Sequence, residues 1–392
     1  MTVQYVDQLS RNSEWANFKL LIKWRGSVYK TVWRNMLVYL LLYLIISFVY
    51  RFALPDCHRR IFEKVVLRLS SFGSVIPISF VLGFYVGLVV NRWLDIFRNM
   101  PWPDNAAILA STNVHGTSEE ARTIRVTALR YVNLSIAITF ATICPAVKET
   151  LNTAEDLLRE GYIIEKEINT IKKLEEQTDQ HKAWLPSMWA CKILAQAREG
   201  GHIESDLALK AIVAEILGIR VKCGTLLGYY GNNIPLNYTQ VVNVTVYIYF
   251  GFSLIAEQFL DPNMGYPGHT LDYYVPVFGL LELFFYIGWL NVADSLLDPF
   301  GEEDHDFELF KFLERNVKMT ELLCDVMPSD LPPGVGEQES QGDEKQESSL
   351  LTDILPYDLP ITADQPDTPL YDEDDLDATS IDSSKPPESW YY

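Results

Sequence analysis

An uncharged run at residues 75–90, VIPISFVLGFYVGLVV, constrains the fold of this chain more than any other segment. It forms the centre of an apolar stretch at residues 72–93 that is long enough to cross a bilayer as a helix. Lipid offers the backbone no hydrogen-bond partners, so a single segment in this environment must be helical. Pro77, Gly83 and Gly87 interrupt the run, and a helix that only anchors a protein needs no such interruptions.

Two faces of this helix can be assigned from the spacing of its residues. Ser79, Gly83 and Gly87 recur every four positions, and small residues on one face let helices approach closely in lipid. Large apolar residues recur with the same spacing on an adjacent face: Ile76, Phe80 and Phe84. This second face suits a pore-lining helix, although periodicity alone favours ordinary packing and would make Pro77 an ordinary kink.

Three further apolar segments, at residues 29–53, 234–259 and 273–292, complete a set of four membrane spans. The apolar segment 131–147 is shorter and carries polar residues, so we expect a buried helix of the soluble part. Residues 155–182 are dense in Glu and Lys, which indicates solvated helices. With no sustained strand alternation, the predicted class is an all-α polytopic membrane protein with a large cytosolic helical region. The basic start of the chain has no apolar stretch typical of a cleaved signal peptide.

The net charge of −20 is concentrated at the end of the chain, because residues 330–392 hold 17 acidic and 2 basic residues. Such a segment buries too little apolar surface to fold, so we expect disorder. It is either a solubilising tail or an inhibitory or partner-binding segment that docks through residues 350–359. We expect no nucleic-acid partner.

Catalytic motifs are absent from the sequence. Its five cysteines show no CxxC spacing, its six histidines form no HExxH pair, and neither GxSxG nor GxxxxGK occurs. These absences indicate that the chain is not an enzyme.

Acidic residues in two places could carry a function. The segment 298–308, DPFGEEDHDFE, offers carboxylates that suit Ca²⁺, or it is a solvated acidic linker. Glu282 lies in the fourth span, where a carboxyl group indicates either a pathway or an interhelical hydrogen bond. Tyr238, Thr239 and Gln240 could contact a permeant ion, but interhelical hydrogen bonds are the stronger interpretation.

Several motifs together resemble the bestrophins, a family of calcium-activated anion channels. They occur in the family's order over residues 1–325 and include IPISFVLGFYV (76–86), PWPD (101–104), IPLNYTQVV (234–242), FFYIGWLNVA (284–293) and DPFGEEDHDFE (298–308). The resemblance implies a homopentamer with Ile76, Phe80 and Phe84 at the pore neck and Leu207 at a cytosolic aperture. The stripe Ser79, Gly83 and Gly87 would then let five neck helices pack together.

The resemblance also implies a calcium site. Its ligands would be the side chains of Asp298, Glu303 and Asp306 with main-chain carbonyls of Ser10 and Ser295, supported by Glu302. The family usually has Asn at position 298, Asp at position 303 and a neutral amide at position 282, so calcium affinity and the pH dependence of conduction are expected to differ here.

We therefore expect a calcium-activated chloride channel in the plasma membrane with both termini in the cytosol. The alternatives are a secondary anion transporter and a non-conducting calcium-sensing scaffold. The expected organisation is an N-terminal segment that contributes to the calcium site (1–30), the first two spans with the neck (31–100), a cytosolic helical region (101–230), the last two spans (231–295), the acidic calcium site with its following helix (296–325) and the acidic tail (326–392).

Overall fold

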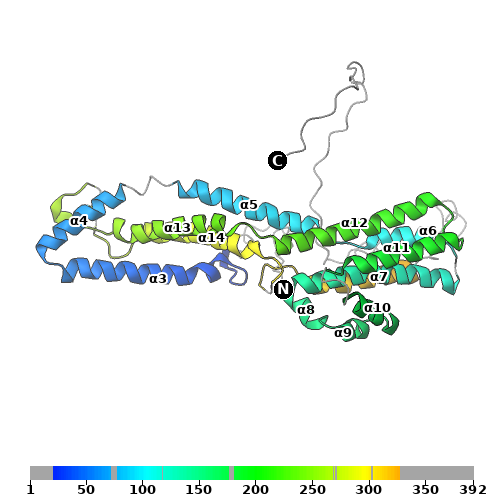
Figure 1. The fold of residues 1–392 in the computed structure, drawn as a ribbon. Coiled ribbons are helices and arrows are strands. Elements are labelled where there is room, and N and C mark those ends of the chain that lie inside the picture. The colour runs from blue at the N-terminus through cyan, green and yellow to red at the C-terminus, as the bar shows by residue number, and fades with distance from the viewer. Residues whose placement is uncertain are drawn as a thin grey trace, which may run out of the picture. The chain divides into compact units, whose positions relative to one another are not determined.

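The computed structural model divides into two compact units, Met1–Leu331 and Pro332–Tyr392, and the residues that it describes all lie in the first. These are residues 21–71, 77–116, 118–175, 181–267, 269, 272–301 and 303–326. All regular elements in these ranges are helices (Figure 1). The predicted all-α class is therefore confirmed, and the predicted tail lies outside the described residues.

Four helices that share one apolar core are long and apolar enough to cross a membrane. They are α3 (Val28–Phe48, continued by the π-helix η1, Val49–Ala53), α5 (Ile78–Arg98), α13 (Leu236–Ala256) and α14 (Val277–Leu297). Helix α14 packs against α3 and α5, and α13 packs against both of these and against the connecting helix α4 (Asp56–Ser70) (Figure 1). Each span thus buries one face and leaves another exposed.

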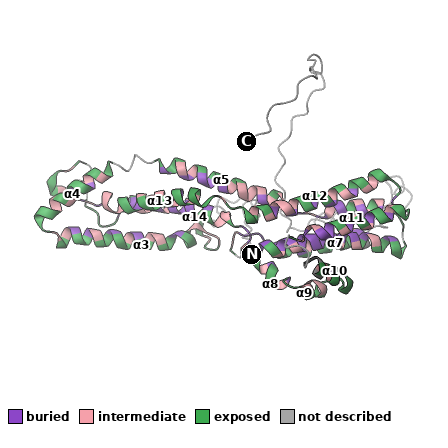
Figure 2. Cartoon of the chain, in the orientation of Figure 1, coloured by how far each residue is buried: buried purple, intermediate pink, exposed green. Residues whose placement is uncertain are grey.

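The exposed faces of these helices remain apolar. Leu37, Leu41 and Ile45 on α3 are 48%, 52% and 59% exposed, and exposed residues recur along the whole helix (Figure 2). A continuous apolar surface of this kind would be unfavourable in water but is stable against lipid. The four spans are those that the sequence predicts.

A fifth helix, α7 (Glu119–Ile143), also has the length and composition of a span but belongs to a second core. Its most apolar stretch is 67% buried, whereas the corresponding stretches of the other four are only 22–28% buried. Four helices pack against it: α6 (Asp104–Asn113), α11 (Trp184–Glu199), α12 (Asp206–Gly231) and α15 (Leu309–Glu321). The expectation of a buried helix here agrees with this packing. Further elements complete the described fold: α8 (Pro145–Thr150), α9 (Ala154–Arg159), α10 (Glu165–Glu175), η2 (Pro262–Met264) and η3 (Leu322–Val326).

Prolines set the starts of three spans. Pro77, Pro235 and Pro276 are the N-cap residues of α5, α13 and α14, and none of these starts has a side-chain cap. The interpretation of Pro77 as a kink within a helix is therefore wrong, because α5 begins after it. Proline is well tolerated at a helix start, where its missing N–H has no intrahelical partner in any case.

The prediction of purely solvated helices at residues 155–182 is wrong for one residue, Glu167. Its carboxylate lies 2.7–2.9 Å from both terminal nitrogens of Arg130 and accepts a 2.5 Å hydrogen bond from Tyr131. The Arg130 side chain is 19% exposed and that of Glu167 is 10% exposed. The Glu167 carboxylate thus connects α10 to α7. The spacing of charges along one helix does not reveal such a pairing between two helices.

We predict that Glu167→Gln destabilises the protein by on the order of 2–3 kcal/mol, because it leaves the Arg130 charge largely buried without its partner. Thermal unfolding of the purified chain in detergent measures the effect. Glu119→Gln is the matched control, since Glu119 is 83% exposed and pairs with Arg122 on the same helix. It should change stability by less than about 1 kcal/mol, and equal effects of the two variants would contradict the assignment.

Candidate functional site

Helix α5 presents two aromatic side chains on a face that no other part of the described chain covers. Phe80 and Phe84 are 64% and 61% exposed, and their ring centroids lie 4.7 Å apart. The opposite face, with Leu82, Tyr85 and Val89, is fully buried in the core of the spans. Ile76, the third residue predicted for the neck, lies outside the described residues. Phe80 and Phe84 lie together on one face, as the spacing predicts, and their rings meet edge to face at 66°.

The stripe of small residues on α5 has few contacts within one subunit. Gly83 is half-buried, and a Cβ atom there would lie an ordinary 3.6 Å from the Trp289 ring of α14. Ser79 is exposed, and a Cβ atom at Gly87 would meet nothing within 4 Å. Packing within the chain therefore does not require glycine at either position. The role of the stripe in contacts between subunits stays a prediction.

The predicted cytosolic aperture residue, Leu207, is the second residue of α12 and is 78% exposed. Ser205 caps this helix through its hydroxyl, which accepts a 3.2 Å hydrogen bond from the Leu207 backbone N–H. Leu207 is thus an uncovered apolar side chain at a well-defined helix start. Within the described residues, no contact brings Leu207 together with Phe80 or Phe84.

Arg92 connects α5 to the C-terminal end of α12. Its guanidinium group donates hydrogen bonds to the backbone carbonyls of Tyr229 and Asn232, the latter at 2.9 Å, and lies 5.1 Å from the centroid of the Tyr229 ring. These carbonyls end a helix and would otherwise lack partners, and a cation is favourable at this pole of the helix dipole. The sequence analysis missed this residue, although a lone arginine after an uncharged run is a visible signal.

The acidic segment after α14 forms a compact loop closed by its own backbone. Phe307 N–H donates to the Pro299 carbonyl at 2.9 Å, and the Asp306 carboxylate accepts a 2.6 Å hydrogen bond from the Glu303 N–H. Burial raises the pKa of Asp306, and the neighbouring carboxylates of Glu303 and Asp298 raise it further. Asp298, Glu303 and Asp306 are thus close enough to repel one another, which a bound cation would relieve.

The side chains alone do not make a metal centre. Within the described residues, no group of three His, Cys, Asp or Glu side chains converges to hold a metal ion. Calcium accepts backbone carbonyls as readily as carboxylates, so the donor set that the sequence predicts still fits its chemistry. Ser295 lies beside this loop and lines a cavity of about 110 Å³ that also includes His305. Ser10 and Glu302 lie outside the described residues.

Asp304 has a different role from its acidic neighbours. It accepts hydrogen bonds from Arg25 at 3.2 Å and from Lys30 at 2.9 Å, and these interactions lower its pKa to about 2. The acidic loop is therefore attached to the segment that leads into α3. Sequence reasoning noted these basic residues but did not pair them, because 274 or more positions separate them from Asp304.

An aromatic stack joins the acidic loop to the neck helix. The Phe307 ring lies 5.1 Å from the Trp93 ring and 5.9 Å from the Phe97 ring, measured between centroids. Trp93 and Phe97 stack on each other at 6.2 Å, one turn apart on α5. Phe307 directly follows the predicted ligand Asp306, so the loop and α5 are in direct contact.

The predicted span 273–292 puts Glu282 near its middle. In the structure Glu282 is the sixth residue of α14 and thus lies nearer the start of the helix. Its carboxylate accepts a 2.7 Å hydrogen bond from the Tyr249 hydroxyl of α13. This supports the interpretation of an interhelical hydrogen bond. Tyr238, one of the three polar residues considered for ion contact, instead packs its ring 6.0 Å from the Tyr85 ring.

These features define a polytopic helical membrane protein with an uncovered aromatic face on one span and an acidic loop packed against that span. The chain belongs to the bestrophin family, because its residues 1–326 match the family described as bestrophin, RFP-TM, chloride channel. That description names transport rather than catalysis, in agreement with the prediction that the chain is not an enzyme.

Individual relatives and solved structures agree with this assignment. The chain is 41% identical to human bestrophin-3 over 332 residues, which cover 85% of this chain and 49% of the relative. It is 42% identical to mouse bestrophin-2 over 332 residues, which cover 84% of this chain and 65% of the relative. The chain thus spans about half to two thirds of the length of these relatives. A mutant of a bacterial bestrophin homologue from Klebsiella pneumoniae has a similar fold, with a TM-score of 0.53, 19% identity and coverage of 74% of this chain and 97% of that one.

We predict that Arg92→Ala loosens the end of α12, because two terminal carbonyls lose their donor. Hydrogen exchange of the amides near residues 226–231 should become at least about fivefold faster, which corresponds to a loss of about 1 kcal/mol. Arg98→Ala is the control, since the Arg98 side chain is 70% exposed and pairs with Asp95 on the same helix. Unchanged exchange in Arg92→Ala would show that the guanidinium group does not hold this helix end.

Proposed function

We propose that this chain is a calcium-activated chloride channel of the plasma membrane, assembled as a homopentamer around a central pore. The observation that carries the proposal is the exposed pair Phe80 and Phe84 on a span of a protein whose family is described as a chloride channel. Four spans would leave both termini on one side of the membrane, which we take to be the cytosol. The names of the relatives and the family description support this function.

The neck would close by excluding water. Five copies of Ile76, Phe80 and Phe84 form stacked apolar rings, and a narrow apolar constriction loses its water and stops conducting ions. The close approach of five α5 helices is assigned to Ser79, Gly83 and Gly87, which keep one face of the helix small. Leu207 would form a second apolar ring on the cytosolic side.

Selectivity for anions would come from backbone N–H groups rather than from basic side chains. The starts of α5, α13 and α14 have a proline N-cap and no side-chain cap, so several N–H donors there remain available. A helix start carries a partial positive charge that favours chloride. No basic side chain occurs within α13 or α14, so these two helices can offer an anion only neutral donors such as backbone N–H groups.

Calcium would act through the acidic loop. Asp298, Glu303 and Asp306 supply carboxylates, Ser10 and Ser295 supply carbonyls, and Glu302 supports the site. Binding would tighten the loop, and Phe307 would transmit the change to α5 because it stacks on Trp93 and Phe97. A ligand shifts a conformational equilibrium only by its difference in affinity for the two states, so calcium must bind the open state more tightly.

Recording from the purified chain in planar bilayers tests this function. We expect an anion current that appears with micromolar calcium on one side and disappears with chelator. Saturable flux without single-channel steps would favour a transporter, and calcium binding without any current would favour a scaffold. Either result would overturn the proposal.

We predict that replacing Ile76, Phe80 and Phe84 together by alanine produces a current that no longer needs calcium, because small side chains leave the neck hydrated. The open probability in chelator should rise at least about tenfold, equivalent to about 1.4 kcal/mol in the opening equilibrium. Leu37, Leu41 and Ile45 replaced together by alanine form the control, since these side chains lie on the exposed face of α3. A wild-type response in the neck variant would exclude this face as the gate.

We predict that Phe307→Leu weakens activation by calcium while leaving calcium binding intact, because the ring contact with α5 is lost and the ligands are not. The current at saturating calcium should fall severalfold, as measured in bilayers, with calcium binding measured by isothermal titration. Phe310→Leu provides the control, since Phe310 is 47% exposed on α15. If both currents stay equal to that of the wild type, the aromatic stack does not carry the signal.

A further inference from the structure

Glu257 places a carboxyl group in an apolar position between three spans. It directly follows the last residue of α13, and its backbone carbonyl accepts a 3.0 Å hydrogen bond from the Tyr43 hydroxyl of α3. Its side chain extends over Gly279, near the start of α14, so closely that a Cβ atom there would lie 1.8 Å from the Glu257 Oε2 atom. The carboxyl group therefore occupies a slot that only a glycine at position 279 leaves open.

The surroundings of this carboxyl group contain a second acid and several phenols. From α3 it is faced by Tyr39 and Tyr43, and from α14 by Glu282. On α13 itself, Tyr249 lies near it and donates its hydroxyl to Glu282, and Tyr286 of α14 lies beside Tyr249. Tyr39 also exchanges a 3.0 Å hydrogen bond with Ser253.

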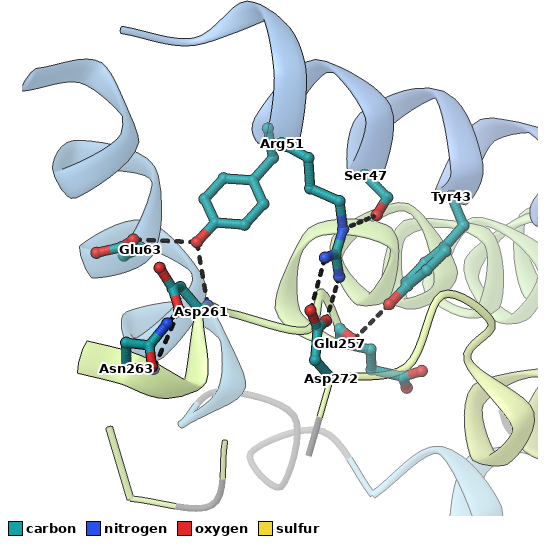
Figure 3. A network of polar contacts seen from close by, with 9 residues as sticks. Tyr43, Ser47, Arg51, Glu63, Glu257, Asp261, Asn263 and Asp272 are labelled. Atoms are coloured by element: carbon teal, nitrogen blue, oxygen red, sulfur yellow. Dashed lines mark hydrogen bonds and ion pairs between the residues drawn. The ribbon is translucent and has the colours of Figure 1, made fainter. Parts of the chain in front are cut away.

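Positive charge does not reach this position. The nearest basic residue, Arg51, forms a two-point ion pair with Asp272 and lies over the Tyr274 ring, and Figure 3 shows the Glu257 carboxyl turned away from that pair. Among the described residues, no basic side chain forms an ion pair with Glu257 or Glu282. Two carboxylates close together without a cation are unfavourable, and such pairs commonly hold one proton between them.

We propose that Glu257 and Glu282 form a proton-binding pair at the junction of α3, α13 and α14, which shares one proton and releases it as the pH rises. Release leaves two negative charges between helices that pack against each other, and this weakens the packing of α13 on α14. The proposal concerns folding stability and does not depend on conduction, so its failure would leave the proposed channel function untouched.

The pKa of the Glu257 carboxyl group agrees with a position beside a second acid and away from basic side chains. Burial raises the pKa of its carboxyl group from 4.5 to about 7, and the charge of Glu282 contributes to the increase. Because the folded chain holds this proton more tightly than the unfolded chain, the stabilisation is complete below about pH 4.5 and is lost as the pH rises through 7. The stability of the protein should therefore fall between about pH 5 and pH 8.

Thermal unfolding of the full chain in detergent, measured from pH 5 to pH 9, tests the proposal. We expect the unfolding midpoint of the wild type to fall by at least about 2 °C across this range, with the steepest change near pH 7. Glu257→Gln should remove this step, the fall of the unfolding midpoint near pH 7, since the amide cannot release a proton. Glu282→Gln keeps the titrating carboxyl group of Glu257 but removes its acidic neighbour, so the step should move to lower pH.

A matched control separates this pair from the fully buried carboxyl groups and from histidines. Glu63 is a fully buried acid, but Arg60, Tyr50 and Tyr266 bind it, and its pKa is lowered rather than raised. Glu63→Gln should lower the unfolding midpoint at every pH and leave the step near pH 7 in place. An unchanged step in Glu257→Gln would overturn the proposal, because it would assign the titration to another group. A step that shifts when sodium replaces choline would also overturn it, because the ligand would then be a metal cation.

Discussion

The burial of one face of α5 against α14 is the contact on which the rest of the described structure depends. It orients the helix so that Leu82, Tyr85 and Val89 enter the core while Phe80 and Phe84 remain uncovered. At its other end the same helix carries Arg92 and Trp93, which contact α12 and the acidic loop. A single helix thus takes part in the core of the spans, the second core and the site proposed for calcium.

Sequence reasoning could predict this helix because its signals are local. Hydropathy located the four spans to within a few residues, and a spacing of four placed Phe80 on Phe84. The proline caps show where such reasoning fails, since Pro77 was read as an interruption when it marks a beginning. A proline is compatible with a kink and with a helix start. The sequence alone does not show which of the two it marks.

The contacts that the sequence did not reveal are all long-range and mostly polar. Glu167 belongs to a charged helix, yet its partner Arg130 lies 37 positions earlier. Asp304 belongs to an acidic run, yet it binds residues at the start of the first span. Local charge patterns show that a residue is charged but not which opposite charge the fold brings to it. The resemblance to bestrophins supplied roles for single residues that periodicity left open.

The polar groups of the spans divide into paired and unpaired ones. Arg51 is paired with Asp272, and Glu63 is paired with Arg60 of the same helix and accepts hydrogen bonds from Tyr50 and Tyr266, so both acids keep their charge over a wide range of pH. Within the described residues, Glu282 accepts a hydrogen bond from the neutral Tyr249 hydroxyl, and neither Glu257 nor Glu282 forms an ion pair with a basic side chain. The same bundle therefore contains acids that stay ionised beside a basic partner and, in our proposal, acids whose protonation changes with the pH.

The attachment of Arg92 to α12 has a mechanical consequence. Helix α12 has 26 residues and is therefore about 39 Å long, with Arg92 bound at one end and Leu207 exposed at the other. If α5 tilts and takes the bound end of α12 with it, a rotation of about 5° moves the far end by about 3 Å. With Arg92 as the attachment, α12 would act as a lever, and a small tilt of α5 would become a movement of atomic size at Leu207.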